Sequence, residues 1–387
     1  MHLLVLNNGT SSLKYGIFSI DAASGNPVGS APQLLAAGQL QSSADEDANH
    51  GTKADQLLQS LLNEATLPTI DAVGHRVVHG ADHFDGPVLI DDEVRSRIAE
   101  LGLFAPLHNP ADLAVIEQAQ RWLPNALQLA VFDTSFHRTL PPQAYTYAVP
   151  SAWTNAGIRR YGFHGISVSY VCRRTARLLK RPLEQLNLIV LHLGSGASAT
   201  AVANGRSVET SMGITPLEGL VMSRRSGDID PSVIDIVSRQ TGRSFDSVAH
   251  SLVHESGLHG LCGTADMREV WQRADAGEED ATLAIEVYCH RLRKYIGAYT
   301  AVLGHLDAIV FTGGVGEHDA RLRQKTVESL TSLGINIDPS LNDRAEGECS
   351  ISSPASPVRL LVVPTNEEQE IARQIQQFMA TSGQSFG

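Results

Sequence analysis

A polar stretch near the start of the sequence carries the residue types that hold a phosphate. Residues 7–14 read Asn-Asn-Gly-Thr-Ser-Ser-Leu-Lys, and apolar runs lie before them at 3–6 and after them at 15–20. Two such runs joined by glycine and hydroxyl residues predict a β-hairpin. Glycine lets a turn approach a ligand closely, and successive N–H groups with hydroxyl side chains can surround an anion. With the charge of Lys14 beside it, the turn is either a phosphate-binding hairpin or a surface hairpin with a polar tip.

Two arginines stand where an anion would explain them. Arg76 lies in a predicted strand over 71–80, and a guanidinium inside a buried strand is costly unless it meets an anion or a carboxylate. Arg225 follows Arg224 in an irregular segment, and guanidinium groups match the geometry of carboxylate and phosphate. The alternative for Arg76 is a purely structural ion pair. The alternative for Arg224 and Arg225 is that they are exposed to solvent and pair with the nearby Asp228 and Asp230.

Three further polar residues stand at places where ligands gather. Asp133 follows a buried strand over 127–132, and ligands of α/β sheets bind at the carboxyl ends of strands. The alternative is that Asp133 is a helix cap. His108 precedes Asn109, which is predicted to cap a helix whose N-terminus favours anions. His164 lies between glycines, which predicts either a functional or a purely structural histidine.

The segment 186–203 repeats the pattern of the first hairpin. A long apolar strand ends at Leu193, the turn Gly194-Ser195-Gly196 follows, and a second β-like run leads to the hairpin signal Asn204-Gly205. The glycines match the dinucleotide fingerprint GxGxxA, but that fingerprint needs a helix after the glycines. Because a strand follows instead, and because GxxxxGK[ST] is absent from the sequence, neither a Rossmann site nor a P-loop is predicted.

The elements that must position these residues mix strands with helices. Residues 21–55 are predicted to be loop-like. A strand over 308–312 leads into the glycines of 313–316, which would let a nucleotide lie against bare backbone. Hydrophobic periodicity predicts the other elements as helices over 54–63, 109–122, 281–303 and from 365 onward, and a strand over 359–363.

Composition narrows the class of protein. A length of 387 residues is more than one ordinary core holds, which predicts two domains. The formal charge of −12 argues against a nucleic-acid or anionic-membrane binder. The four cysteines are widely spaced without a CxxC pair, so neither a metal site nor a disulfide framework is expected. With no signal peptide or membrane-length apolar run, the sequence predicts a cytoplasmic protein with free thiols.

Motifs along nearly the whole chain, from Leu3 to about Phe378, resemble those of the acetokinase family. They occur in the family's order, and together they are far more specific than any one alone. The motifs are NNGTSSLK, GHRVVHG, APLHNP, VFDTSFH, RYGFHG, HLGSGAS, TSMGITPLEGL, RRSGDIDP, FTGGVGE and PTNEE. The resemblance implies an α/β fold with two duplicated actin-like (ribonuclease H-like) domains around a nucleotide cleft. It assigns 1–136 with 369–387 to the first domain and 137–368 to the second.

The resemblance also implies a reaction. The chain would transfer the γ-phosphoryl group of ATP reversibly to acetate, giving acetyl phosphate and ADP by direct in-line transfer. Mg²⁺, or Mn²⁺ in its place, would assist, and the protein would be a homodimer. Since acetate is already ionised at neutral pH, a general base is scarcely needed. We therefore expect Asp133 to orient groups or to organise the metal rather than to accept a proton.

Roles follow for the residues that match the family's motifs. Asp133, His164 and Arg225 would be catalytic, with His164 stabilising the transition state. Asn7 and Glu367 would help to hold the metal. The substrate would be bound by Arg76, Val78, Leu107, His108 and Pro216. ATP would be bound by Lys14, His192, Leu193, Gly194, Ser195, Gly196, Asp266, Met267, Arg268, Gly314, Val315, Gly316, Glu317 and His318.

The chain departs from the family's usual pattern at a few positions. Family members usually have Ala and Ser where it has Asn8 and Thr10, and Asn where it has Ser195 and His318. The shorter Ser195 leaves its contact with phosphate open, and His318 leaves the base preference open. A propionate or butyrate kinase, an actin-like ATP-dependent switch and a non-catalytic nucleotide binder are the alternatives. The branched Val78 favours the smallest acid, and the two acyl-binding arginines argue against a switch.

Overall fold

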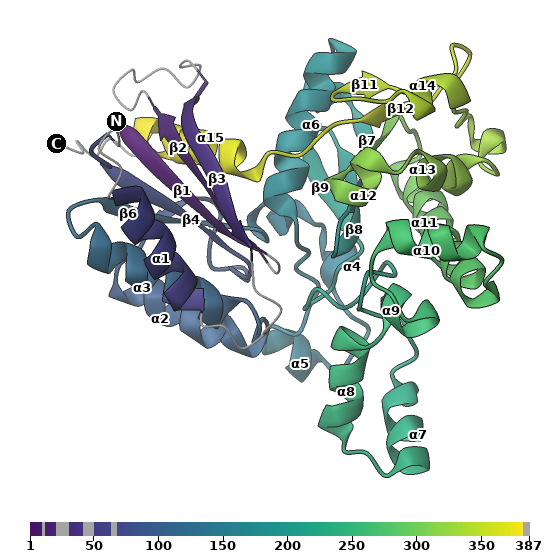
Figure 1. Cartoon of the computed structure of the whole chain (residues 1–387), viewed down its shortest axis with the longest axis horizontal. Coiled ribbons are helices and arrows are strands. Elements are labelled where there is room, and N and C mark those ends of the chain that lie inside the picture. Colours follow the sequence, from purple (N-terminus) through teal and green to yellow (C-terminus); the bar gives the residue numbers. More distant parts are fainter. Residues whose placement is uncertain (10–11, 21–30, 42–49, 63–67, 382–387) are drawn as a thin grey trace. The chain divides into compact units, whose positions relative to one another are not determined.

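The chain divides into two compact units, each built on its own sheet (Figure 1). The computed structural model describes residues 1–9, 12–20, 31–41, 50–62 and 68–381, so Thr10 and Ser11 of the first predicted turn lie outside it. The first unit takes the described residues of Met1–Arg138, Gly165–Ser167 and Asn366–Gly387. The second unit takes Thr139–His164 and Val168–Thr365.

The first unit contains a six-stranded mixed sheet with the order β3-β2-β1-β4-β6-β5. The central strands β1, β4 and β6 run parallel, whereas β2, β3 and β5 each pair antiparallel with a neighbour. The predicted first hairpin is confirmed as β1 and β2. The strands are β1 His2–Asn8, β2 Ser12–Ser19, β3 Gln33–Gln41, β4 Ala72–Val77, β5 Val88–Leu89 and β6 Leu127–Phe132.

The second unit repeats this sheet strand for strand. Its order is β11-β12-β10-β7-β8-β9, with β7, β10 and β12 parallel and β8, β9 and β11 antiparallel to a neighbour. Strand order, direction and sequence order all match the first sheet, which confirms the predicted duplicated α/β fold. The strands are β7 Asn187–Leu193, β8 Ala197–Ala203, β9 Arg206–Thr210, β10 Ala308–Thr312, β11 Cys349–Ser350 and β12 Arg359–Val362.

One strand contradicts the sequence-based prediction. Residues 33–41 were expected in a loop but form β3, which pairs along its length with β2. The stretch reads QLLAAGQLQ, and Ala, Gly and Gln have little preference for strands. Pairing with the exposed edge of β2 therefore decides its conformation, and this pairing is invisible in the local sequence.

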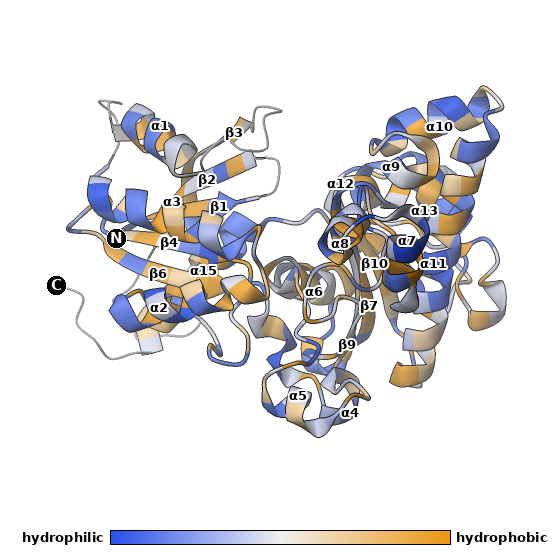
Figure 2. Cartoon of the chain, turned by 90° about the horizontal axis from the view of Figure 1, so that it is seen from below, coloured by the Kyte–Doolittle hydropathy of each residue, from blue (hydrophilic) through white to orange (hydrophobic). Residues whose placement is uncertain are grey.

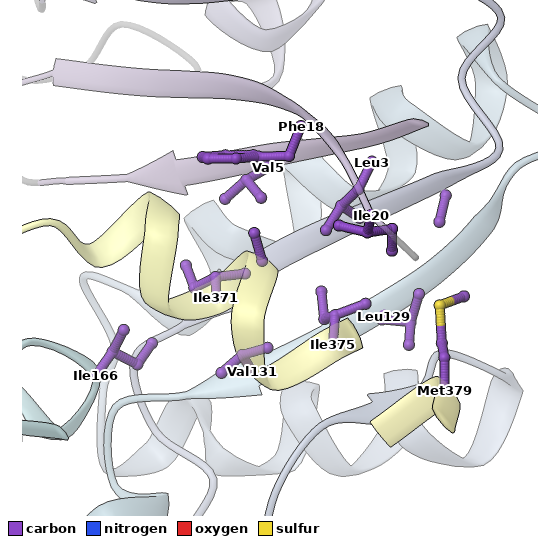
Figure 3. Packing of buried hydrophobic residues seen from close by; sticks show 12 residues of the cluster. Leu3, Val5, Phe18, Ile20, Leu129, Val131, Ile166, Ile371, Ile375 and Met379 are labelled. Atoms are coloured by element: carbon purple, nitrogen blue, oxygen red, sulfur yellow. The ribbon is translucent and has the colours of Figure 1, made fainter. Parts of the chain in front are cut away.

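The C-terminal helix α15 (Glu367–Thr381) covers one face of the first sheet. Leu3 and Val5 of β1 point to this face and share a buried cluster with Ile375 (Figure 3). Gly74 of β4 lies under the helix, where a Cβ would come within 2.4 Å of the Ile375 side chain. The glycine thus lets α15 pack closely, and it keeps the residues at the start of α15 at the edge of the first sheet.

The opposite face of the first sheet is covered by α1 (His50–Leu62) and α3 (Asn109–Trp122). Leu4 and Leu6 alternate with the residues that face α15 and pack with apolar residues of these two helices. Since both faces are buried, the central strands are mostly apolar, as β6 is in Figure 2, although β4 also contains His75 and Arg76. In the second unit, α11 (Glu279–Leu303) packs against β7 and β8.

The remaining helices are mostly short. The helix predicted over 281–303 is confirmed as α11. The prediction that Asn109 caps α3 is wrong by one residue, because the helix begins at Asn109 and His108 is the cap residue. The other helices are α2 Asp92–Glu100, α4 Pro142–Tyr145, α5 Ser151–Asn155, α6 Gly165–Leu179, α7 Ser232–Thr241, α8 Phe245–His254, α9 Gly257–Cys262, α10 Met267–Asp275, α12 Gly313–His318, α13 Ala320–Val327 and α14 Pro339–Asp343.

Candidate active site

The carboxyl ends of the three parallel strands in the first unit bring three predicted residues to one edge. Asn7 lies near the end of β1, Arg76 near the end of β4, and Asp133 directly after β6. The register of the sheet sets Leu6 beside His75 and Arg76 beside Val131, so the three strand ends are level. The three residues therefore lie along one edge of the first sheet.

Arg76 is held by carboxylates and by the main chain. Its guanidinium forms an ion pair with Asp133, whose side chain is 1% exposed, and its Nε lies 3.9 Å from Oε2 of Glu367. Its Nη1 donates to the carbonyl of Asn8 at 2.9 Å. Burial acts to lower the pKa of Arg76, but Asp133 and Glu367 outweigh burial and hold the pKa above its ordinary value. Arg76 is therefore a fixed positive charge with acidic partners.

Asn7 is oriented by two acidic residues at the start of α15. Its Nδ2 donates to Oε2 of Glu367 at 2.9 Å and to Oε1 of Glu368 at 2.7 Å. Because carboxylates only accept, the amide NH₂ must face them, and its carbonyl oxygen Oδ1 points elsewhere. Glu368 was not predicted as a site residue. The predicted metal residues Asn7 and Glu367 are thus brought together, with oxygen atoms of the type that Mg²⁺ prefers.

This oxygen set resembles a magnesium site more than a site for a transition metal. Within the part of the chain that the structure describes, no group of three or more His, Cys, Asp or Glu is arranged to hold a metal. Mg²⁺ rarely needs such a group, because it keeps several waters and is bound through one or two protein oxygens plus substrate phosphates. Asn7 and Glu367 fit that pattern.

The predicted substrate residues of the first unit lie directly after β4 and just before α3. Val78 follows β4 and is buried, whereas Leu107 is 51% exposed. His108 is half-buried at the start of α3, with a side chain that makes no capping hydrogen bond to the helix. Lys14 is exposed on β2, directly opposite Asn7 in the register of β1 and β2.

In the second unit, the turn between β7 and β8 is a tight glycine turn. The N–H of Gly194 donates to the carbonyl of Gly196 at 2.9 Å, and His192 faces Ser198 across the two strands. The carbonyl of Ser195 accepts the N–H of Ser223 at 3.2 Å. The main chain of Ser195 therefore connects the turn between β7 and β8 to the segment that contains Arg224 and Arg225.

His164 lies beside this turn in a defined orientation. Its Nδ1 is 2.9 Å from the Oγ of Ser198, and its ring stacks on that of His192 with centroids 4.2 Å apart. The main chain at His164 is left-handed, with φ of 59°, which an L residue adopts at some cost. The glycines around it in the sequence thus mark an unusual backbone, as expected, and the hydrogen bond and the stacking fix the ring.

Arg225 has the opposite surroundings from Arg76. Its Nη1 donates to the carbonyl of Pro216 at 3.2 Å, and among the described residues it forms no ion pair with an acidic side chain. Burial lowers the pKa of Arg225, and no acidic group raises it. A Cβ on Gly196 would lie 3.5 Å from the ring of His164 and 3.6 Å from Nη1 of Arg225, so both side chains border the glycine turn.

The alternative that Arg224 and Arg225 are solvated partners of the nearby aspartates is wrong for Arg225. Asp228 instead accepts from the N–H of Gly219 and the hydroxyl of Tyr295, both at 2.9 Å. Asp230 accepts the N–H of Ser232 at 2.9 Å. Of the two adjacent arginines, Arg224 is exposed and Arg225 is half-buried. Arg225 is therefore a partly desolvated cation without an acidic neighbour, which is the arrangement that an anionic ligand completes.

The remaining predicted nucleotide residues lie at two helix starts in the second unit. Asp266 caps α10 through the N–H of Arg268 at 2.9 Å and pairs with the guanidinium of Arg268 at 2.5 Å, while Met267 between them is buried. Gly314, Val315, Gly316 and His318 follow β10 as the sequence predicted, but they lie within α12 and not before a helix. Gly314 is exposed, and a Cβ there would meet nothing within 4 Å.

Glu317 of α12 is engaged within the protein. Its Oε1 accepts the N–H of Gly313 at 2.8 Å and the N–H of Thr365 at 3.1 Å. It therefore fixes the start of α12 and ties it to Thr365. Its predicted place beside the nucleotide stays a prediction.

Sequence reasoning missed one buried acid of the first unit. Asp112 is 2% exposed and accepts hydrogen bonds from the side chain of Asn8 and the N–H of Val78, both at 3.0 Å. It lies in the first turn of α3, where an acidic residue is expected to favour the helix dipole and so attracts no notice. Its burial depends on contacts with residues that are distant in the sequence, such as Asn8, so no local signal marks it.

Comparison with known proteins identifies the family. A model of the acetokinase family matches residues 2–373. An acetate kinase of Syntrophobacter fumaroxidans is 44% identical, with 100% of this chain and 99% of that protein covered. An acetate kinase of Sulfurovum is 47% identical, with 97% and 98% covered.

Solved structures give the same picture. An acetate kinase from Porphyromonas gingivalis matches with a TM-score of 0.82 at 38% identity, over 96% of this chain and 98% of that one. A propionate kinase from Francisella tularensis matches with a TM-score of 0.84 at 38% identity, over the same shares. The chain thus belongs to the acetokinase family of phosphotransferases, which use ATP as co-substrate and the carboxyl group of acetate as acceptor.

Proposed function

We propose that this acetate kinase reaction proceeds by direct in-line transfer, with Arg225 and His164 meeting the charge on the transferring phosphoryl group. An acetate oxygen attacks the γ-phosphorus, the bond to the β–γ bridging oxygen breaks, and ADP leaves with that electron pair. The observation that carries this proposal is the partly desolvated Arg225 guanidinium beside the glycine turn, which has no acidic partner in the part of the chain that the structure describes. Phosphoryl transfer depends mainly on positioning and on charge stabilisation, which these groups supply.

In the first unit, Arg76 would bind the carboxylate of acetate and Asp133 would hold Arg76 in place. Asp133 already pairs with a strong cation, which favours the ionised carboxylate and suits an orienting role rather than that of a base. The N–H groups of the glycine turn and the ring of His192 would lie along the phosphates of ATP. Val78, Leu107 and Pro216 would border the methyl group, with His108 beside them.

Asn7 and Glu367 would hold Mg²⁺. When bound, the ion would neutralise charge on the phosphates of ATP. The chain's own contribution is to orient the oxygen donors, which the two hydrogen bonds from the amide of Asn7 achieve. Lys14, Asp266 with Arg268, and the start of α12 would contact the nucleotide.

The predicted domains, 1–136 with 369–387 and 137–368, are proposed as the two functional halves. They correspond to the two compact units to within a few residues, apart from the segment Gly165–Ser167. We also propose a cytoplasmic homodimer, as the resemblance implies. No helix among the described residues is long and apolar enough to cross a membrane.

Propionate is the second candidate acceptor, because the chain is as similar to a propionate kinase as to an acetate kinase of known structure. We favour acetate because Val78 is branched and buried. Discrimination should be modest, since one methylene in an apolar pocket is worth only about 1–3 kcal/mol.

Acyl phosphate formation trapped with hydroxylamine tests this function. The enzyme would be given ATP and Mg²⁺ with acetate, propionate or butyrate, and each reaction repeated with excess EDTA. We expect acetate to give the highest kcat/KM and EDTA to abolish the product. ATP hydrolysis without any acyl phosphate would instead support an ATP-dependent switch, and a higher kcat/KM for propionate would reverse the choice of substrate.

A further inference from the structure

Three consecutive N–H groups just beyond β4 are each held by a side chain from another element. The N–H of Val78 donates to Oδ2 of Asp112, the N–H of His79 to Oδ1 of Asn109, and the N–H of Gly80 to Oγ1 of Thr134, at 3.0 to 3.1 Å. Two of the acceptors belong to the first turn of α3 and the third follows β6. Side chains therefore set the course of this segment, including the position of Val78.

Asp112 also makes a second contact, which leads to Arg76. Its Oδ1 accepts Nδ2 of Asn8 at 3.0 Å, and the carbonyl of the same Asn8 accepts Nη1 of Arg76 at 2.9 Å. One carboxylate thus joins the end of β1, which holds a nitrogen of Arg76, to the segment that carries Val78.

A carboxylate is well suited to this link, because it only accepts and has two oxygens for two donors. An apolar residue at position 112 would take away the acceptor of a main-chain N–H and of an amide N–H in a buried place. The location is nevertheless costly for a charge. Burial raises the pKa of Asp112 to about 7, although Arg76 and the hydrogen bonds from Asn8 and Val78 act to lower it. An acid with so large a burial cost is a candidate for a functional role.

We propose that Asp112 is a positioning residue that fixes Arg76 and Val78 relative to each other and thereby sets how the carboxylic acid substrate is bound. The inference rests on the proposed function, in which Arg76 meets the carboxylate and Val78 borders the methyl group. Asp112 touches neither substrate nor metal in this scheme and acts through Asn8 and through the N–H of Val78.

The test replaces Asp112 by alanine and measures KM for acetate and for ATP in the hydroxylamine assay. We expect the KM for acetate to rise by about tenfold, because two buried donors lose their acceptor, and the KM for ATP to stay within about twofold. The preference for acetate over propionate should also fall, because Val78 is no longer fixed. Glu117→Ala is the matched control, since Glu117 is exposed on the same helix.

A merely structural role of Asp112 would give a different pattern. Lower stability with both KM values unchanged, or with both raised equally, would overturn the inference. Wild-type enzyme that forms no acyl phosphate would overturn the proposed function itself, whereas active wild type with an unaffected Asp112→Ala variant would overturn only the positioning role.

Two milder variants keep the test decisive if Asp112→Ala does not fold. Asn8→Ala removes the hydrogen bond from the Asn8 side chain to Asp112, and with it the link from Asp112 to Arg76. It should raise the KM for acetate by about threefold without changing the preference for acetate over propionate. Asp112→Asn keeps an acceptor for the N–H of Val78 and should retain that preference. Independent, additive effects of Asn8→Ala and Asp112→Asn in the double variant would contradict a shared link.

Discussion

The two units use equivalent hairpins to build sites of opposite charge. At the end of β1 and β4, Arg76 is surrounded by Asp133 and Glu367, and Asn7 is held by Glu367 and Glu368. Beside the turn of β7 and β8, Arg225 has no acidic partner among the described residues. The first site therefore has an excess of carboxylates, whereas the second has an excess of positive charge.

This difference shows how one duplicated sheet can carry two sites of different charge. Carboxylate and amide oxygens suit a hard cation and can hold an arginine rigidly for a small carboxylate. A glycine turn with an unpaired arginine suits phosphate oxygens. Strand order alone sets neither property, because the two sheets have the same order and direction. The few side chains at the strand ends decide it.

The largest expected effect is the loss of activity when Arg225, but not the adjacent Arg224, is replaced. Arg225→Ala should lower kcat/KM for acyl phosphate formation by about a hundred- to a thousandfold, or about 3–4 kcal/mol, because a charge contact to the transferring group is lost. Arg224 is exposed, with a single long hydrogen bond of 3.4 Å to the carbonyl of His254, so Arg224→Ala is the matched control and should change little. Equal losses in the two variants would mean that the environment of Arg225 is not what matters.

For the free energy of unfolding, Arg76 should matter more than Arg225. Arg76→Ala leaves Asp133 buried without its cation, which should cost about 3 kcal/mol in the free energy of unfolding. Arg225→Ala removes a cation that has no acidic partner and should leave the stability nearly unchanged. Urea unfolding of both variants beside the wild type measures this. If Arg225→Ala proved as destabilising as Arg76→Ala, the contrast between the two sites would fail.

The sequence predicts the framework of both sites but not this contrast. Apolar runs mark β1, β4, β6 and β7, and a polar residue at the end of such a run is visible at once. Because parallel strands end at one edge of a sheet, Asn7, Arg76 and Asp133 lie together. The partners that distinguish Arg76 from Arg225 come from distant parts of the chain, such as Glu367, and no local pattern encodes them.

Two other misses have different physical causes. Residues 33–41 lack strand propensity, and β3 forms because β2 offers it an edge. Asp112 occupies a helix position where an acid is ordinary, so its burial against Asn8 is a tertiary property. The roles assigned to individual site residues stay predictions, since they depend on ligands and not on the fold.

A histidine next to Arg76 should make the stability of the first unit sensitive to acid. His75 is buried, its Nε2–H donates to Oε1 of Gln128 at 2.8 Å, and burial lowers its pKa to about 4. Below its ordinary pKa the unfolded chain binds a proton here and the folded chain does not, so stability falls as the pH drops from about 6.5 to about 4. The loss should reach about 2–3 kcal/mol.

His75→Gln removes this titration while keeping a polar partner for Gln128. The free energy of unfolding should therefore fall less steeply between pH 7 and pH 4 in the variant than in the wild type. Urea unfolding at several pH values measures the difference, in which contributions from carboxylates common to both proteins cancel. Parallel curves would show that His75 is protonated as readily in the folded chain as in the unfolded one.

The smallest effect concerns how the second site fixes His164. Ser198→Ala removes the hydrogen bond to Nδ1 but keeps the stacking on His192, so the ring should lose part of its orientation. We expect kcat to fall by about fivefold, or about 1 kcal/mol, with KM for both substrates unchanged, because in the proposed function the ring acts in the transition state. Thr200→Val on the same strand is the control, since Thr200 bonds to Thr210 rather than to the histidine. A Ser198→Ala variant with full kcat would mean that stacking alone positions the ring, and the second site would then depend on Arg225 and the glycine turn.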